Sequence, residues 1–216
     1  MAMRVCILGA GGLGSLVGGM LAESGLRVTL VGRPEHVEAI RQGGLRISGI
    51  SGERRIVGGL DAVESAARVR GPFDALILCV KAKDTEAVLR DANGLRADAG
   101  VVFSLQNTIA KDAALAEWIG RDRVVGASTT EAATMDGAGS VRHVATAPTA
   151  LAVIFTAVAP TVMAASPTAT SAEHPAVVSV RPRVMAAASG FGNIMWVSCS
   201  VRCRSDTRID SEFNSP

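Results

Sequence analysis

The chain has 216 residues, of which 48% are hydrophobic and only 3% are aromatic, and its formal net charge is +2. This length fits one large domain, or one domain and part of a second. The nearly balanced charge argues against nucleic acid or an acidic membrane surface as a partner. Because the chain contains no tyrosine, its core must be built mainly from valine, leucine, isoleucine and alanine.

The first predicted element is an apolar strand at residues 4–8, which runs directly into a glycine-rich turn. The spacing Gly-x-Gly-x-x-Gly is formed by the run Gly9-Ala10-Gly11-Gly12-Leu13-Gly14. Apolar residues at helical spacing follow over residues 15–23, and this order of strand, turn and helix is typical of dinucleotide binding. Gly9 allows the tight turn, Gly11 lets a pyrophosphate approach the backbone, and Gly14 allows the helix to pack closely on the strand. The alternative is a glycine-rich turn that binds nothing.

A second strand is predicted at residues 27–31, after a helix that ends at Gly25. In a site that prefers NAD, an Asp or Glu near the end of this strand would bind the ribose hydroxyl. Here Arg33 occupies that region, about 20 residues after the glycine turn, which fits a 2′-phosphate and therefore NADP. The alternative is an arginine in a solvated loop.

Shorter elements are predicted next. Residues 34–42 form a helix that begins with proline and ends at a pair of glycines. Residues 45–47 and 54–57 are predicted to form a small hairpin, and residues 61–68 a short helix.

Two further strands, at residues 73–80 and 101–104, place candidate site residues. Lys81 and Asn107 follow their carboxyl ends, which is the edge where open α/β sheets bind ligands. A lysine there can neutralise a phosphate or a substrate carboxylate, and an asparagine can orient a carboxamide or a substrate carbonyl. The alternatives are a solvated lysine and an asparagine that only closes a turn.

The remaining elements complete an alternation of helices and strands. Helices are predicted at residues 84–92 and 112–119, a strand at 124–128 and a β-ribbon at 139–145. This alternation predicts an α/β fold, with a Rossmann-type, doubly wound parallel sheet that forms a nucleotide-binding domain over residues 1–148.

In combination, these motifs resemble the ketopantoate reductase (2-dehydropantoate 2-reductase) family. The resemblance extends from Met3 to about Pro148. It is carried by the glycine turn and by residues 31–33, 36–37, 39–40, 44–47, 80–82, 104–107, 125–126, 129–130, 139, 141 and 143–144.

The resemblance implies NADPH-dependent reduction of ketopantoate to pantoate, a step of pantothenate synthesis, with a small 2-oxo acid as substrate. By the same resemblance, the glycine turn and Arg33 bind NADP, Lys81 and Asn107 line the nicotinamide side of the cleft, and Ala133 contacts the cofactor. Thr108 stands where the family usually has glycine, so the turn after Asn107 is expected to be altered.

The composition changes after residue 148. Residues 144–172 contain no Asp, Glu, Lys or Arg, but the prolines and many threonines and serines argue against a membrane span. Residues 149–216 are therefore predicted to be an irregular, low-complexity, poorly ordered tail. A reading-frame change would explain it; a distinct short C-terminal segment and a membrane hairpin are the alternatives.

The resemblance also implies a part that this sequence does not match. The family's second domain is all-helical and carries the catalytic lysine, whereas the three lysines of this chain are Lys81, Lys83 and Lys111. No catalytic residue is therefore identified. Two further functions stay open: a reductase of another small 2-oxo acid from the same superfamily, and an NADP-binding remnant without turnover. The oligomeric state is not predicted.

The four cysteines give no metal site. Cys6 and Cys79 lie in predicted buried strands and are expected to act as small hydrophobic residues. Cys199 and Cys203 are spaced C-x3-C, without a second pair or a nearby histidine. Unpaired thiols and the absence of a visible signal peptide indicate a cytoplasmic location.

Overall fold

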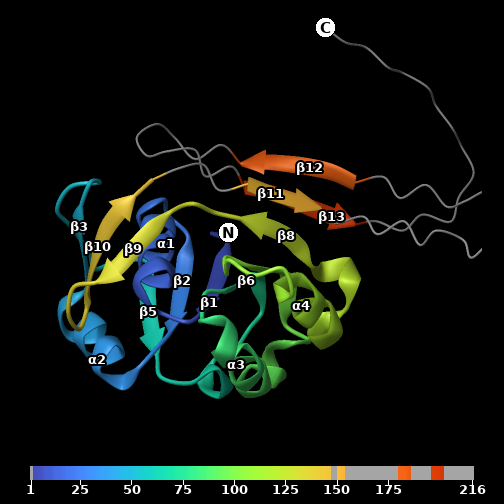
Figure 1. Cartoon of the computed structure of the whole chain (residues 1–216), viewed down its shortest axis with the longest axis horizontal. Helices are drawn as coiled ribbons and strands as arrows, with labels where there is room; N and C mark the ends of the chain where they lie inside the picture. The colour runs from blue at the N-terminus through green and yellow to red at the C-terminus, as the bar shows by residue number, and fades with distance from the viewer. Residues whose placement is uncertain (1, 147–149, 154–179, 186–195, 202–216) are drawn as a thin grey trace, which may run out of the picture. The chain divides into compact units, whose positions relative to one another are not determined.

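The computed structural model of the chain describes residues 2–146, 150–153, 180–185 and 196–201 (Figure 1). The elements up to residue 153 belong to one unit, which contains the candidate site. In a second unit, β12 (Val180–Met185) and β13 (Trp196–Val201) pair as an antiparallel ribbon. The rest of the segment predicted to be an irregular tail lies outside the described residues.

Five parallel strands form the central sheet, in the order β5-β2-β1-β6-β7. Their bounds are Arg4–Leu8 for β1, Arg27–Val31 for β2, Leu60–Val63 for β5, Phe73–Leu78 for β6 and Ala99–Ser104 for β7. After β1, the chain adds β2 and then β5 on one side of β1. It then crosses over and adds β6 and β7 on the other side. This is the Rossmann strand order, so the predicted doubly wound sheet is confirmed, and its switch point lies between β1 and β6.

Four α-helices accompany these strands: α1 (Gly12–Glu23), α2 (Pro34–Gly43), α3 (Thr85–Asp91) and α4 (Lys111–Ile119). Helix α1 is buried along most of its length because sheets cover it on two sides (Figure 1). Its glycines make this possible. A Cβ on Gly18 would lie 2.5 Å from the Leu30 side chain of β2, and one on Gly19 would lie 2.7 Å from the Ile47 side chain.

The second sheet that packs on α1 has four strands, in the order β4-β3-β10-β9. They are β3 (Leu45–Gly49), β4 (Arg54–Ile56), β9 (Ala132–Met135) and β10 (Ser140–Ala145). The predicted hairpin and the predicted β-ribbon are both confirmed. The parallel pairing of β3 with β10, which places the fully buried Ile47 opposite Val141, joins them into one sheet.

The short helix predicted at residues 61–68 is wrong over most of its length. Residues 60–63 form β5, the edge strand beside β2, and only Ala66–Arg68 forms a 3-10 turn. The flanking backbone bonds Val28 N–H to Gly59 O (2.8 Å) and Gly32 N–H to Val63 O (2.9 Å) continue this pairing. The open edge of β2 therefore outweighs the weak local helical pattern.

Strand β8 (Val125–Ser128) is present as predicted, but it does not pair along the central sheet. It pairs antiparallel with β11 (Ala150–Val153), and one parallel bridge joins Val102 of β7 to Val124. None of the helices in the described ranges has the length and apolar character needed to cross a membrane.

Two cysteines lie in or next to the central sheet, and they differ in burial: Cys79 is only half-buried. Cys6 of β1 is completely buried, and Cys79 follows β6; neither is in a disulfide. Burial raises the pKa of each thiol to about 12. Both thiols therefore stay protonated near neutral pH. Cys6 packs as a small hydrophobic residue in a buried strand, as predicted, whereas Cys79 lies just after the end of β6 and not within it.

Candidate functional site

The glycine turn leaves β1 in a conformation that only glycine adopts readily. Gly9 has a φ of +112°, and a Cβ there would lie 2.8 Å from the backbone nitrogen of Val80. Its N–H and that of Ala10 both donate to the Val31 carbonyl, at 3.0 and 2.7 Å. Gly9 is therefore the point at which β1, β2 and the end of β6 meet.

The other two motif glycines differ in what they face. A Cβ on Gly14 would lie 2.1 Å from the Gly9 carbonyl oxygen, so packing within the protein requires glycine there. Gly11 is exposed, and a Cβ there would meet no atom within 4 Å. Protein packing does not require glycine at position 11, whereas close approach of a ligand to the backbone would.

The open space at Gly11 lies at the amino end of α1. Gly11 is the N-cap residue, no side chain caps the helix, and its first turn contains no acidic residue. The free N–H groups and the positive end of the helix dipole therefore favour an anionic ligand at this position.

Arg33 follows the carboxyl end of β2, which lies beside the glycine turn. It is exposed and is the N-cap residue of α2. A Cβ on the preceding Gly32 would lie 2.7 Å from Cβ of Ala10, which brings the end of β2 against the glycine turn. The nearest acidic residue along the chain, Glu35, lies in the first turn of α2.

Ala133 also lies beside the turn, although it is more than a hundred residues away in the sequence. A Cβ on Gly12 would lie 2.4 Å from the Ala133 carbonyl oxygen. Strand β9 therefore runs directly past the first turn of α1, and no side chain larger than hydrogen fits between them.

Lys81 and Asn107 follow β6 and β7 at the carboxyl edge of the sheet, and both are exposed. Val80, which packs on Gly9, precedes Lys81, so the lysine is one residue from a contact with the turn. Within the part of the chain that the structure describes, no residue other than glycine has a positive φ, so Thr108 does not strain the turn after Asn107.

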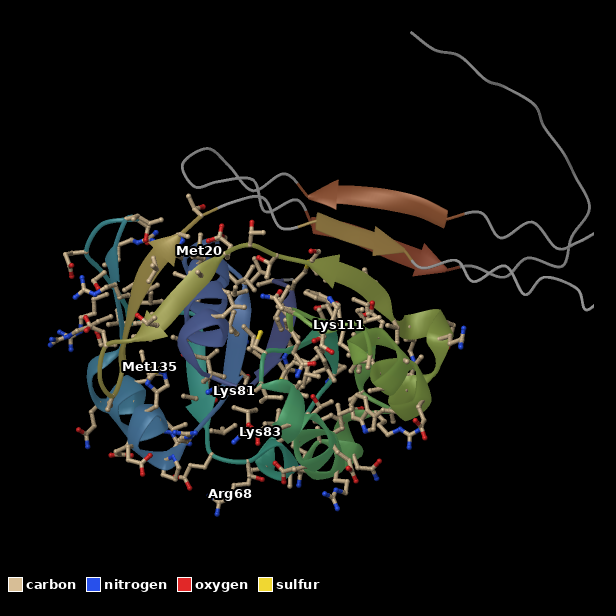
Figure 2. All side chains as sticks on the ribbon, in the orientation of Figure 1. Met20, Arg68, Lys81, Lys83, Lys111 and Met135 are labelled. Carbon is tan, nitrogen blue, oxygen red and sulfur yellow. The ribbon has the colours of Figure 1, made fainter. Side chains whose placement is uncertain are left out.

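The third lysine has a different role from the first two. Figure 2 shows Lys81 and Lys83 on the loop before α3 and Lys111 at the start of α4. The Lys111 ammonium donates to the Ser104 carbonyl at 3.1 Å and also to the Ala127 carbonyl. It therefore joins the carboxyl ends of β7 and β8 instead of standing free in solvent.

The sequence marks His36 only as a motif residue, whereas the structure shows it as a buried hydrogen-bonding group. Its Nδ1 accepts a hydrogen bond from the Gly139 N–H at 2.9 Å, because a backbone N–H can only donate. The proton of the neutral ring is therefore on Nε2, which donates to Ser15 Oγ at 2.8 Å. Burial lowers the pKa of His36, which is only 4% exposed. This side chain joins α1, α2 and the β9–β10 turn in its neutral form.

We expect the free energy of unfolding to fall as the pH drops below about 6.5, the usual pKa of an unfolded histidine. Below that pH, unfolded His36 takes up a proton that folded His36 does not, since its folded pKa is lowered. The contribution of neutral His36 to the free energy of unfolding is complete above about pH 6.5. It declines below that pH until the pH reaches the lower pKa of the folded state. Urea unfolding of the unmutated chain and of His36→Gln between pH 5 and 8 would measure it. Equal pH slopes in the two proteins would contradict this account.

A second buried polar group holds the start of β9 to the end of β10. His143 Nε2 lies 2.7 Å from Glu131 Oε2 and 3.0 Å from the Ala145 carbonyl, and the Thr146 hydroxyl donates to Glu131 Oε1 at 2.9 Å. The side chain of His143 is 3% exposed and that of Glu131 is 2% exposed. The pair lies where the β9–β10 register is interrupted, just before Ala133. Nothing local in the sequence links Glu131 and His143, so this pair could not be predicted from it.

The described ranges contain no group of three His, Cys, Asp or Glu side chains that could hold a metal ion. Of the two cysteines with C-x3-C spacing, Cys199 lies in β13 and Cys203 lies outside the described residues.

Comparison with known proteins gives a consistent result over the same part of the chain. Residues 5–154 match the family model described as ketopantoate reductase PanE/ApbA. The 2-dehydropantoate 2-reductase of Halobacterium salinarum is 37% identical over 150 residues, which cover 69% of this chain and 48% of the relative. That of Pyrococcus horikoshii is 37% identical over 139 residues, which cover 64% and 44%. The chain thus spans about half the length of the curated relatives it matches.

Solved structures agree. A PanE/ApbA family ketopantoate reductase from Ralstonia eutropha matches with a TM-score of 0.63 and 34% identity, over 69% of this chain and 49% of that chain. A D-mandelate dehydrogenase solved with NADH and anilino(oxo)acetate matches with a TM-score of 0.61 and 28% identity, over 69% and 48%.

Proposed function

Because this chain belongs to the ketopantoate reductase PanE/ApbA family, we propose that residues 1–148 form the nucleotide-binding half of an NADP-dependent 2-dehydropantoate 2-reductase. The observation that carries this proposal is the convergence on the glycine turn. Open space at Gly11, an uncapped helix, the end of β2 and the start of β9 lie together at one edge of the sheet.

The residues present fit a dinucleotide phosphate. The N–H groups at the start of α1 would bind the pyrophosphate, the Arg33 guanidinium would bind the 2′-phosphate, and the backbone at Ala133 would contact the cofactor. When bound, NADPH supplies the hydride. The absence of an acidic residue at positions 31–33 supports NADP over NAD.

The substrate we propose is ketopantoate, a small 2-oxo acid. The positive charge of Lys81 and the amide of Asn107 lie at the carboxyl edge, where they would attract a carboxylate and orient a carbonyl. The D-mandelate dehydrogenase likeness leaves another 2-oxo acid as a second candidate, but the names of the curated relatives favour ketopantoate.

Cofactor choice tests this proposal through Arg33. The unmutated chain should bind NADPH more tightly than NADH, and Arg33→Ala should remove a preference of about tenfold or more. The reason is that one charge-assisted hydrogen bond contributes on the order of 1.5–3 kcal/mol. Isothermal titration calorimetry with both nucleotides measures the ratio. Arg27→Ala, an exposed arginine at the opposite end of β2, is the matched control. Equal affinities of the unmutated chain for the two nucleotides would argue against NADP as the cofactor.

A further inference from the structure

Gln106 precedes the exposed Asn107 directly, but its own side chain turns back into the protein. It is 9% exposed, and its Nε2 lies 2.8 Å from the Val80 carbonyl oxygen and 2.8 Å from Thr85 Oγ1. Because a carbonyl oxygen only accepts hydrogen bonds, the amide nitrogen must face Val80, and its second N–H then donates to the threonine hydroxyl.

These two hydrogen bonds hold both ends of one loop. Val80 follows β6 and Thr85 begins α3, so the bonds enclose residues 81–84. Inside this segment the Asp84 N–H donates to the Lys81 carbonyl at 2.9 Å, which closes a turn. The position of Lys81 is therefore set by a tight turn whose two ends are bonded to the same amide nitrogen.

Gln106 is itself held by the sheet. Its backbone N–H donates to Ser104 Oγ at 3.1 Å, and the Leu105 N–H donates to the Leu78 carbonyl at 3.0 Å. Asn107 is the next residue and is exposed. The Gln106 backbone thus precedes Asn107 directly, while its side chain holds the loop of Lys81.

Among the described residues, no polar contact holds the exposed side chain of Lys81 or of Asn107 in place. Within the described part of the chain, the Lys81 ammonium and the Asn107 amide form no hydrogen bond or ion pair. We propose that Gln106 is a positioning residue that holds Lys81 and Asn107 at one spacing across the ends of β6 and β7. This inference rests on the proposed function, in which these two residues face the nicotinamide half of the cofactor.

The physical effect is preorganisation. With the loop already held, binding of the nicotinamide half does not have to order residues 81–84, so less conformational entropy is lost on binding. The adenosine half, which the glycine turn and Arg33 would bind, does not depend on this loop. The role of Gln106 therefore predicts a difference between two ligands rather than a general loss of stability.

The experiment compares NADPH with 2′,5′-ADP, which carries the 2′-phosphate but no nicotinamide, by calorimetry on the full chain. Gln106→Met keeps the length of the side chain and removes both donors. We expect it to weaken NADPH binding about tenfold or more and to change 2′,5′-ADP binding less than about twofold. Gln42→Met, a glutamine on the exposed face of α2 that bonds only Glu38, should change neither affinity.

Thr85→Val tests the same bond from its other end and removes only one acceptor, so a smaller loss of NADPH binding is expected. Hydrogen exchange adds a measurement without nucleotide: residues 81–85 should exchange faster in Gln106→Met, and the strands of the central sheet should not. Equal weakening of both ligands, no weakening, or faster exchange throughout the chain would overturn the inference. If the unmutated chain binds neither nucleotide, the proposed function is overturned and the inference with it.

Discussion

Replacement of Gly11 by valine is expected to abolish nucleotide binding while the domain stays folded. A Cβ at this position meets no protein atom within 4 Å, and the backbone φ of −84° is one that valine adopts readily. The branched side chain would, however, fill the space in front of the first turn of α1, where a pyrophosphate must approach the backbone. A loss of affinity of at least about a hundredfold is expected.

Calorimetry with NADPH measures the affinity, and circular dichroism with urea unfolding measures the fold. Gly58→Val is the matched control, because Gly58 is also exposed, lacks a positive φ and faces open space, but lies between β4 and β5. Gly14→Val should behave differently from both. Its Cβ would lie 2.1 Å from the Gly9 carbonyl, so the folded domain itself should be lost. Retained nucleotide binding by Gly11→Val would mean that the turn has only a structural role.

The second large effect concerns turnover: the 216-residue chain is expected to reduce ketopantoate with NADPH at a rate close to background. The family resemblance implies that the proton donor is a lysine of a helical second domain, and residues 149–216 contain no lysine. Loss of a general acid typically costs about 10²–10⁴-fold in rate. Loss of substrate orientation can add roughly 7–11 kcal/mol to the barrier.

The structure makes a substitute donor harder to find among the three lysines. The Lys111 ammonium is bonded to two backbone carbonyls, and Lys81 and Lys83 are exposed on the loop before α3. The assay is the fall in NADPH absorbance with ketopantoate, on purified protein of confirmed mass. Sustained turnover above about 1 s⁻¹, within the ordinary range of enzymes, would contradict the prediction. The variants Lys81→Met, Lys83→Met and Lys111→Met would then show which lysine donates the proton.

Local signals were sufficient for the part of the fold that surrounds the glycine turn. The strand before Gly9 and the helix after it follow from apolar spacing and from glycine positions within some twenty residues of sequence. The same holds for α2, where Pro34 stands at the first helical position. In each case the residues that decide the element lie within it or next to it.

The errors arose where distant segments decide the structure. Residues 60–63 carry a weak helical pattern, and only the free edge of β2 makes them a strand. Likewise, no feature of residues 45–49 indicates that β3 pairs in parallel with β10, which lies about ninety residues further along the chain. Such pairings depend on which backbone groups remain unpaired after the rest of the sheet has formed.

The candidate site divides in the same way. The exposed positions of Arg33 and Lys81 after strand ends could be predicted, because the end of a parallel strand is a recognisable place in a sequence, while their roles in a site stay a prediction. The buried polar residues that hold the site could not. His36 depends on an N–H that lies 103 residues away, and the direction of the Gln106 side chain follows only from the positions of Val80 and Thr85.

Helix α1 has a consequence for how a phosphate would be recognised. One face of the helix lies against β2 and another against β3, at distances so short that a single added methyl group at Gly18 or Gly19 would collide with a side chain. A helix packed this closely on two sides can slide or tilt only if the side chains of Leu30 and Ile47 move with it. We therefore expect its amino end to keep nearly the same position when a ligand binds. Selection among anions would then depend mainly on the size and shape of the anion.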